Sequence, residues 1–288
     1  MRCLIWGVIV LVSLTYNLFA QNVIPVAEHI VIVVLENQSK RHITGNENAP
    51  FLNSLLNDSN CAFFSRSFGV THPSQPNYLM LFSGSRQHVY NDSALQQLPL
   101  TTPNLASALL EKGLSFAGYA EDLPFPGYSG NHTGKYAKRH CPWVNWQNSQ
   151  ENRIPEKCNL PFSEFPEDFN LLPTVSFVIP NLDHDMHDPP NIAVAIKEGD
   201  DWLKKNIEGY LLWAETHNSL LIITFDEDDN HHKNNIPTWI IGQKVKGRQY
   251  SEFINHYSVL RMLEEMFHLP IMGKTNSAKP ITEIWRHD

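Results

Sequence analysis

Cysteine is scarce in this sequence, and acidic residues outnumber basic ones. The four cysteines among 288 residues form no Cys-x-x-Cys pair, which excludes the common structural zinc and dithiol redox motifs. The 22 Lys and Arg residues against 30 Asp and Glu residues give a net charge of -8. Because a nucleic-acid backbone requires a basic surface, this balance argues against nucleic acid as the partner. Internal repeats and low-complexity tracts are also absent.

Long apolar runs are missing from all but the N-terminal segment, so no later segment is predicted to form a stable membrane span. At the N-terminus Arg2 precedes an almost wholly apolar run from 3 to 12, and the polar chain begins at Gln21. This pattern is typical of a cleaved signal peptide, with an uncleaved N-terminal anchor as the alternative. We expect residues 1–20 to be a signal peptide and residues 21–288 to form a single secreted or periplasmic domain.

Export would permit a disulfide bond. Removal of the signal would leave Cys61, Cys141 and Cys158. The chain between Cys141 and Cys158 is short and polar, which favours a surface loop closed by a disulfide between them, with Cys61 free and buried. Three free thiols are the alternative.

Apolar runs alternate with helical patterns along the mature chain. The run from His29 to Leu35 has no polar alternation, as expected of a strand buried on both faces of a parallel sheet. Other predicted strands are 115–120, 174–179, 219–225 and 236–242, and predicted helices are 49–56, 77–82, 104–112, 200–216 and 257–267. This order predicts an α/β fold with a largely parallel central sheet and helices on both faces. Residues from about 122 to 170 lack periodicity and are expected to form an irregular loop region over the functional site.

Acidic and polar residues follow three of the predicted strands directly. These clusters are Glu36-Asn37, the segment 181–188, and the acidic run from Asp226 to Asp229. Ligands of open α/β sheets bind beyond the carboxyl ends of the strands, so the three clusters are expected to converge. Carboxylates that lie close together are costly unless a cation or protons lie between them. Each cluster alone also fits a turn or a solvated loop, but together they predict a divalent metal site.

Ser74 lies between two prolines in the segment His72-Pro73-Ser74-Gln75-Pro76-Asn77. Proline is tolerated in the first turn of a helix, so Ser74 is predicted to lie near a helix N-terminus. Free backbone N–H groups at such a terminus stabilise anions, and a phosphate attacked by Ser74 would benefit from them. The alternative is that Ser74 serves only as a helix N-cap.

Three of the fourteen histidines lie in the segments that carry these features. His140 is in the irregular region, His187 is in the cluster after the strand at 174–179, and His256 directly precedes the last predicted helix. The pair His231-His232 lies in a polar loop and is given little weight.

Seven segments, in order along nearly the whole mature chain, match the motifs of one family. They are VVLENQS (33–39), HPSQPNYLMLFSG (72–84), PNLDHDMHD (180–188), GDDWL (199–203), TFDEDD (224–229), IPTWIIG (236–242) and NHYSVLRMLEEMF (255–267). They resemble the phosphoesterase family of bacterial acid phosphatases and phosphatidylcholine-type phospholipases C, within the alkaline phosphatase superfamily. The resemblance implies an alkaline-phosphatase-like fold and hydrolysis of phosphate esters, and it is much less specific for the substrate.

The resemblance also implies site roles. One divalent metal ion, whether Zn, Ca, Mg or Mn, would be held by Glu36, Asn37, Ser74, Asp226 and Glu227. The phosphoryl group would be contacted by Asn77, His140, His187 and His256. In two-zinc relatives of the wider superfamily, a second metal is held by residues that would correspond here to Asp183, His187 and His256. Those relatives have Asp-His where this chain has Asp226-Glu227, and this difference favours one metal.

The implied reaction begins with in-line attack by Ser74, which would form a phosphoserine that water then hydrolyses. His187 or His256 would protonate the leaving oxygen, and protonated histidines would favour activity at mildly acidic pH. We therefore expect a secreted acid phosphatase acting on a small phosphorylated substrate or a phospholipid head group. A phospholipase C or another phosphodiesterase is the alternative, followed by a non-catalytic protein that binds a metal or ligand. The Cys-x-Pro-x-Arg pattern of sulfatases is absent.

Overall fold

The computed structural model describes residues 24–188 and 191–286, so the predicted signal peptide at 1–20 lies outside the described residues. Nine of the described strands form one central sheet: β1 (His29–Leu35), β2 (Cys61–Phe68), β3 (Phe116–Ala120), β6 (Asn159–Pro161), β7 (Val175–Ile179), β8 (Ser219–Phe225), β9 (Asn235–Ile241), β10 (Arg248–Tyr250) and β11 (Ile254–Asn255). The α-helices of the described residues are α1 (Lys40–Ile43), α2 (Pro50–Ser54), α3 (Ser74–Ser83), α4 (Leu105–Glu111), α5 (Ile192–Ala214) and α6 (His256–Met266).

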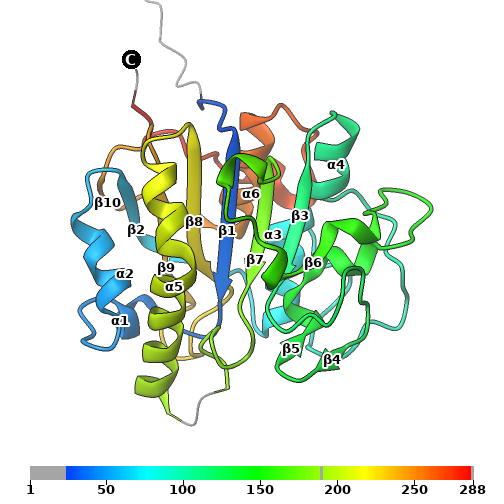
Figure 1. Cartoon of the computed structure of the whole chain (residues 1–288), viewed down its shortest axis with the longest axis horizontal. Coiled ribbons are helices and arrows are strands. Elements are labelled where there is room, and N and C mark those ends of the chain that lie inside the picture. Colours follow the sequence, from blue (N-terminus) through cyan, green and yellow to red (C-terminus); the bar gives the residue numbers. More distant parts are fainter. Residues whose placement is uncertain (1–23, 189–190, 287–288) are drawn as a thin grey trace, which may run out of the picture.

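The sheet has the strand order β10-β2-β9-β8-β1-β7-β3-β6, with β11 paired to β2. Strand β1 is parallel to both β7 and β8, and β3 is parallel to β6 and β7, whereas β9 is antiparallel to β2 and β8. Helices α1, α2 and α5 lie on one face and α3, α4 and α6 on the other (Figure 1). The predicted α/β fold with a largely parallel sheet is therefore confirmed.

The alternation of side chains along β1 explains why this run is apolar throughout. Ile30, Ile32 and Val34 pack into the core that contains residues of α3 and α6. The intervening residues, such as Val31 and Val33, pack into the opposite core, which contains residues of α5. Because both faces are covered, no polar side chain follows His29 until Glu36, directly after the carboxyl end of the strand.

Several predicted elements have different limits in the structure. The helix predicted at 77–82 begins earlier, at Ser74, and the helix predicted at 200–216 begins at Ile192. Strand β2 was not predicted, because Ser65, Arg66 and Ser67 interrupt the apolar pattern next to a register shift in the pairing with β9.

The segment from 122 to 170 contains short 3-10 helices and strands of two or three residues, among them β4 (His132–Thr133) and β5 (Tyr136–Ala137). It also contributes the edge strand β6 and buries the rings of Trp143 and Trp146 completely. Trp143 lies directly on Gly118 of β3, where an added Cβ would be 2.1 Å from the ring atom Cε2. Trp143 and Trp146 therefore belong to the core beside the sheet.

Replacing Gly118 with alanine is expected to destabilise the protein by about 1–3 kcal/mol or more, because the buried ring of Trp143 must move to admit a methyl group. Gly209→Ala is the matched control, since an added Cβ there meets nothing closer than 3.7 Å and alanine favours helix α5 by roughly 0.5–1 kcal/mol. Urea unfolding of both variants measures the difference. Equal stability of the two variants would contradict this packing.

The predicted disulfide between Cys141 and Cys158 is wrong. Both residues and Cys61 are free and buried. Cys141 lies in the core that also contains Tyr136 and Trp143, instead of at the surface. The physical reason is that aromatic side chains close to Cys141 are buried in the core, and the chain around Cys141 is buried with them although much of the stretch to Cys158 is polar.

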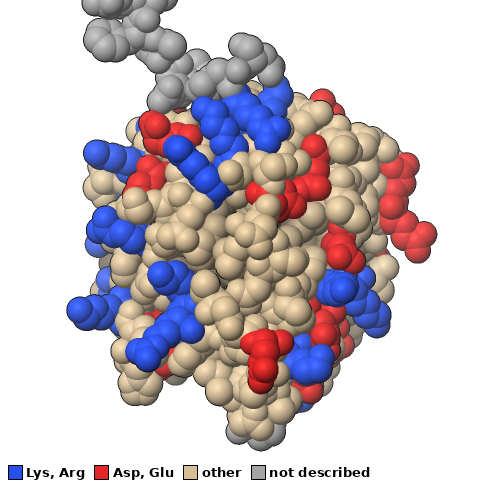
Figure 2. Space-filling view, turned by 90° about the vertical axis from the view of Figure 1, so that its left-hand side faces the viewer, with Lys and Arg blue, Asp and Glu red and all other residues tan. Residues whose placement is uncertain are grey.

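The surface carries charges of both signs. Figure 2 shows Lys and Arg side chains interspersed with Asp, Glu and neutral residues on the side of the molecule where α2 and β10 lie. In the part of the chain that the structure describes, none of the helices has the length and hydropathy needed to cross a bilayer.

Candidate active site

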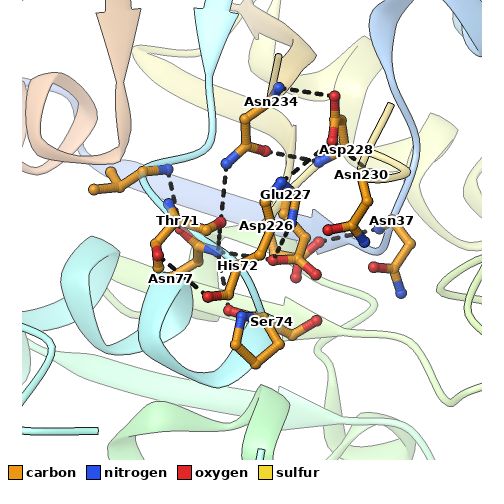
Figure 3. A network of polar contacts seen from close by, with 12 residues as sticks. Asn37, Thr71, His72, Ser74, Asn77, Asp226, Glu227, Asp228, Asn230 and Asn234 are labelled. Carbon is orange, nitrogen blue, oxygen red and sulfur yellow. Dashed lines mark hydrogen bonds and ion pairs between the residues drawn. The ribbon is translucent and has the colours of Figure 1, made fainter. Parts of the chain in front are cut away.

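Ser74 is the first residue of α3, directly after the N-cap residue Pro73, so the alternative that Ser74 is only the N-cap is wrong. Its side chain is buried, and its hydroxyl donates to Glu36 Oε2 at 2.8 Å. The same hydroxyl is close enough to Asp226 and Glu227 to lower the pKa of both carboxyl groups. A serine hydroxyl at the start of a helix therefore lies among carboxylates, of which Figure 3 shows those of Asp226 and Glu227 beside Ser74.

The pairing of β1 with β8 explains this convergence. Leu35 lies opposite Phe225 in the parallel ladder, so Glu36 and Asp226 leave the same edge of the sheet side by side. Asn37 then turns back in the left-handed region, at a φ of 56°, which asparagine tolerates better than most residues. Its backbone N–H donates to Asp226 Oδ1 at 3.1 Å, and its side-chain amide donates to Glu36 Oε2 at 3.1 Å.

The carboxylates of this cluster are buried and close together, which makes their charged forms unfavourable. Burial raises the pKa of Glu36 well above its usual value, and the neighbouring Asp226 and Asp185 raise it further. Burial likewise raises the pKa of Asp226 to about 7 and that of Glu227 to about 9. Asp226 Oδ2 is buried without a hydrogen-bond partner. Protons or a cation must compensate such a group, and the mixture of carboxylates, hydroxyl and amide fits a divalent ion.

Asn77 lies one turn after Ser74 and is fully buried. Its amide nitrogen donates to Glu227 Oε2 at 3.2 Å and to the carbonyl of Thr71 at 2.8 Å. Its carbonyl oxygen accepts the N–H groups of Val70 and Thr71. Asn77 therefore fixes Glu227 and the loop before Ser74.

A second buried group adjoins Glu36. His140 Nε2 lies 3.2 Å from Glu36 Oε1, and His140 Nδ1 lies 3.2 Å from Asp185 Oδ2. The hydroxyl of Tyr78 donates to Glu36 Oε1 at 2.7 Å, and its ring stacks on His140. Burial lowers the pKa of His140 well below its usual value and raises that of Asp185 to about 8. Glu36, His140 and Asp185 form a group whose ligand atoms lie within 4.8 Å of one another.

The set Asp183, His187 and His256, predicted for a possible second metal, does not form such a group among the described residues. The Nζ atom of Lys135 pairs with Asp183 at 2.7 Å, so a cation from the irregular segment already compensates this carboxylate. His256 Nε2 contacts the backbone carbonyl of Asp226 at 2.6 Å. In this structure Asp185 and His140 occupy the position beside Glu36 instead.

The three predicted histidines differ in their surroundings. Burial lowers the pKa of His256 to about 4 and that of His140 well below its usual value, so the surroundings of both rings favour the neutral imidazole. His187 is partly exposed, and its Nε2 lies 3.4 Å from Nη2 of Arg139. The ring of His187 is 5.9 Å from that of His140. His187 is therefore the one of these three histidines whose ring is accessible from solvent.

Several residues of the site were assigned no role from the sequence. His72 Nδ1 lies 2.9 Å from Glu227 Oε2, and His72 Nε2 lies 3.4 Å from Asp228 Oδ1. Arg139 is next to His140 in the chain, and Tyr78 is next to Asn77. The sequence indicated these residues only through their position next to predicted site residues. The directions in which their side chains point are seen only in the folded structure.

A cavity of about 90 Å³ lies beside the start of α3, and Gln75, Asp92, Lys138 and Arg139 contribute to its lining. The backbone N–H of Gln75 donates to Asp92 Oδ1 at 2.8 Å. The helix terminus therefore already binds a carboxylate oxygen, as expected for an anion site. Two cationic side chains at the cavity suit a phosphorylated ligand.

Comparison with known proteins agrees with this geometry. The chain is 45% identical over 271 residues to a phosphatidylinositol-3-phosphatase of Mycobacterium tuberculosis, covering 92% of this chain and 85% of that protein. It is 29% identical to an acid phosphatase of Aspergillus fumigatus, covering 88% of this chain and 57% of that longer protein. A Vibrio parahaemolyticus protein in the alkaline phosphatase superfamily has the same fold, with a TM-score of 0.62 at 14% identity, over 90% of this chain and 72% of that one.

The family match spans most of the chain. Residues 46–270 match the Phosphoesterase family, and this range contains Ser74, Asp226 and Glu227. The matched range also includes His140, Asp185 and the whole of α3. The chain therefore belongs to the Phosphoesterase family, and it is a hydrolase acting on phosphate esters.

Proposed function

We propose that this hydrolase is an exported, metal-dependent acid phosphatase that cleaves phosphate monoesters through a phosphoserine on Ser74. The main support is the 2.8 Å hydrogen bond from the Ser74 hydroxyl to Glu36 at the start of α3, with the carboxylates of Asp226 and Glu227 close by. A nucleophile, an anion-binding helix terminus and a set of metal ligands are then within a few ångströms of one another.

Glu36, Asn37, Ser74, Asp226 and Glu227 would hold the ion, which when bound lowers the pKa of a coordinated hydroxyl and polarises a phosphoryl oxygen. Backbone N–H groups in the first turn of α3 would bind the phosphoryl oxygens in place of Asp92. The Ser74 hydroxyl would pass its proton to Glu36, to which it donates, and the Ser74 oxygen would form the bond to phosphorus as the bond to the leaving oxygen breaks.

His187 is the proposed general acid for the leaving oxygen, because its ring is partly exposed and is oriented by Asp188, whose Oδ1 lies 2.7 Å from His187 Nδ1. The same ring would then accept a proton from the water that hydrolyses the phosphoserine. His256 and Asn77 are positioning residues in this scheme, since they hold the backbone of Asp226 and the carboxylate of Glu227.

Replacing His187 with asparagine is expected to slow hydrolysis of an alkyl phosphate by about 100-fold and of p-nitrophenyl phosphate by less than about 10-fold. The alkyl leaving group needs the proton, whereas p-nitrophenolate leaves readily without it. His217→Asn is the control, since His217 lies at the end of α5 and stacks on Trp213. Measurement of kcat for both substrates decides the role, and equal losses for the two esters would assign His187 to binding instead.

Monoesters are the proposed substrates because the relatives reported above are named as phosphatases. The 45% identity to a phosphatidylinositol-3-phosphatase favours a phosphorylated inositol lipid as a second substrate class. A phospholipase C activity remains the alternative. A panel of p-nitrophenyl phosphate, bis-p-nitrophenyl phosphate, phosphatidylinositol 3-phosphate and phosphatidylcholine, with metal analysis of the same sample, separates these activities. Turnover of diesters alone would overturn the proposal, and a mature N-terminus at Gln21 would support export.

A further inference from the structure

A second group of metal-ligand side chains lies beside the catalytic carboxylates and has no part in the proposed reaction. It consists of His42 on α1 and of Asp229 and His232 in the loop between β8 and β9. One ligand atom from each residue lies within 4.8 Å of the other two. We refer to these three residues as the rim cluster.

The rim cluster is compact and accessible from solvent. His232 Nδ1 lies 2.7 Å from Asp229 Oδ1, and His42 Nε2 lies 3.7 Å from Asp229 Oδ2. The two imidazole rings meet edge to face, with centroids 5.1 Å apart. The side chains of His42, Asp229 and His232 retain 27%, 17% and 25% of their full exposure, so an ion can enter without unfolding of the loop.

The loop is built to keep Asp229 and His232 together. Oxygens of the neighbouring Asp228 accept the backbone N–H groups of Asn230, His232 and Asn234. In contrast, the Nδ1 atom of His42 is buried and has no hydrogen-bond partner. A buried polar atom without a partner is uncommon and calls for an explanation, of which a bound ion is one.

We propose that the rim cluster is a second metal site of this enzyme, which binds a borderline divalent cation such as Zn²⁺. Two imidazoles and one carboxylate are a donor set that suits Zn²⁺ and leaves a further coordination position for water. The site is separate from the group around Ser74, because it shares no side chain with it.

The position of the rim cluster predicts its effect on the enzyme. His42 follows Asn37 by five residues on one side of the active site, and Asp229 follows Glu227 by two residues on the other. An ion at the rim cluster would therefore connect α1 to the β8–β9 loop, the two segments that follow the proposed ligands of the catalytic ion. The rim ion would hold those ligands in place without contacting the substrate.

The test is a count of bound zinc after equilibrium dialysis of the full chain against Zn²⁺. The wild type is expected to bind one more ion per chain than His42→Ala/His232→Ala. His231→Ala is the matched control, because this exposed histidine lies in the same loop next to His232 and outside the cluster. With Co²⁺ as the probe, the wild type and His231→Ala should show an absorption band of an imidazole-bound ion that the double variant lacks.

A conservative variant separates loss of the rim ion from misfolding of the protein. Asp229→Asn keeps the size of the side chain and is expected to weaken zinc binding at the rim by at least about 100-fold. In the Asp226→Asn protein, which disrupts the catalytic group, the rim ion should remain, so loss of the catalytic ion and loss of the rim ion are distinguishable. Equal zinc counts in the wild type, Asp229→Asn and the double variant would show that the rim cluster is only a local ion pair, and the proposal would be rejected.

Discussion

Replacing Ser74 with alanine is expected to reduce kcat for p-nitrophenyl phosphate by at least about 1,000-fold, because the reaction loses its nucleophile. The hydroxyl donates to Glu36 Oε2 at 2.8 Å at the first residue of α3, beside the carboxylates of Asp226 and Glu227. Acid quenching of the wild type during turnover should trap a phosphate on the peptide that contains Ser74. The alanine variant should yield no such peptide.

Ser83→Ala is the control for this experiment. Ser83 is the last residue of the same helix, is also buried, and donates its hydroxyl to the carbonyl of Leu79 at 2.8 Å. Its loss should leave kcat nearly unchanged. Metal analysis of Ser74→Ala is needed as well, since the hydroxyl is also a proposed ligand. Loss of turnover with the metal retained assigns Ser74 as the nucleophile, whereas substantial turnover in Ser74→Ala would refute the proposed mechanism.

Removal of the metal is expected to make stability depend strongly on pH, with the opposite sign to most salt-bridged carboxylates. The folded-state pKa of Asp226 is raised to about 7 and that of Glu227 to about 9, above the usual values of 3.8 and 4.5. The metal-free folded protein therefore keeps protons that the unfolded chain has released. This contribution to stability is fully present below about pH 4 and is lost as the pH rises through about 7 to 9.

Asp226→Asn should reduce that loss. It removes one of the mutually repelling carboxylates, and Asp226 itself raises the pKa values of Glu36 and Glu227. At about pH 8 the chelated variant should be more stable than the chelated wild type by about 2 kcal/mol, since one pKa unit corresponds to about 1.4 kcal/mol. With a saturating divalent ion the order should reverse, and the variant should lose most of its activity and metal affinity.

Urea unfolding at several pH values, with and without chelator, measures these effects. Asp201→Asn is the matched control, because Asp201 is an exposed carboxylate paired with Lys197 on α5. That variant should follow the wild type under all conditions. If chelated Asp226→Asn is no more stable than the chelated wild type at high pH, the carboxylates around Ser74 do not repel one another as proposed.

Much of the fold was predictable because a strand that is buried on both faces appears in the sequence as a continuous apolar run. The runs that became β1, β7 and β8 are apolar on both faces, and each was predicted within one or two residues of its observed limits. Strand β2 was not predicted because polar residues near its register shift break the pattern. The state of Cys141 and Cys158 was also predicted wrongly, because it depends on aromatic side chains that pack from the same segment and from β3.

The sequence by itself determined that Glu36, Asp226 and Ser74 are candidates for one site. Glu36 and Asp226 directly follow apolar runs that predict strands, and Ser74 lies between two prolines at a predicted helix start. Only the tertiary structure decided their partners. Asp185 and His140 are 45 residues apart and meet at Glu36, and His42 meets His232, whose loop had been given little weight. Such contacts arise from the order of strands in the sheet and the packing of α1 and α3 at its edge, and no short segment of sequence records them.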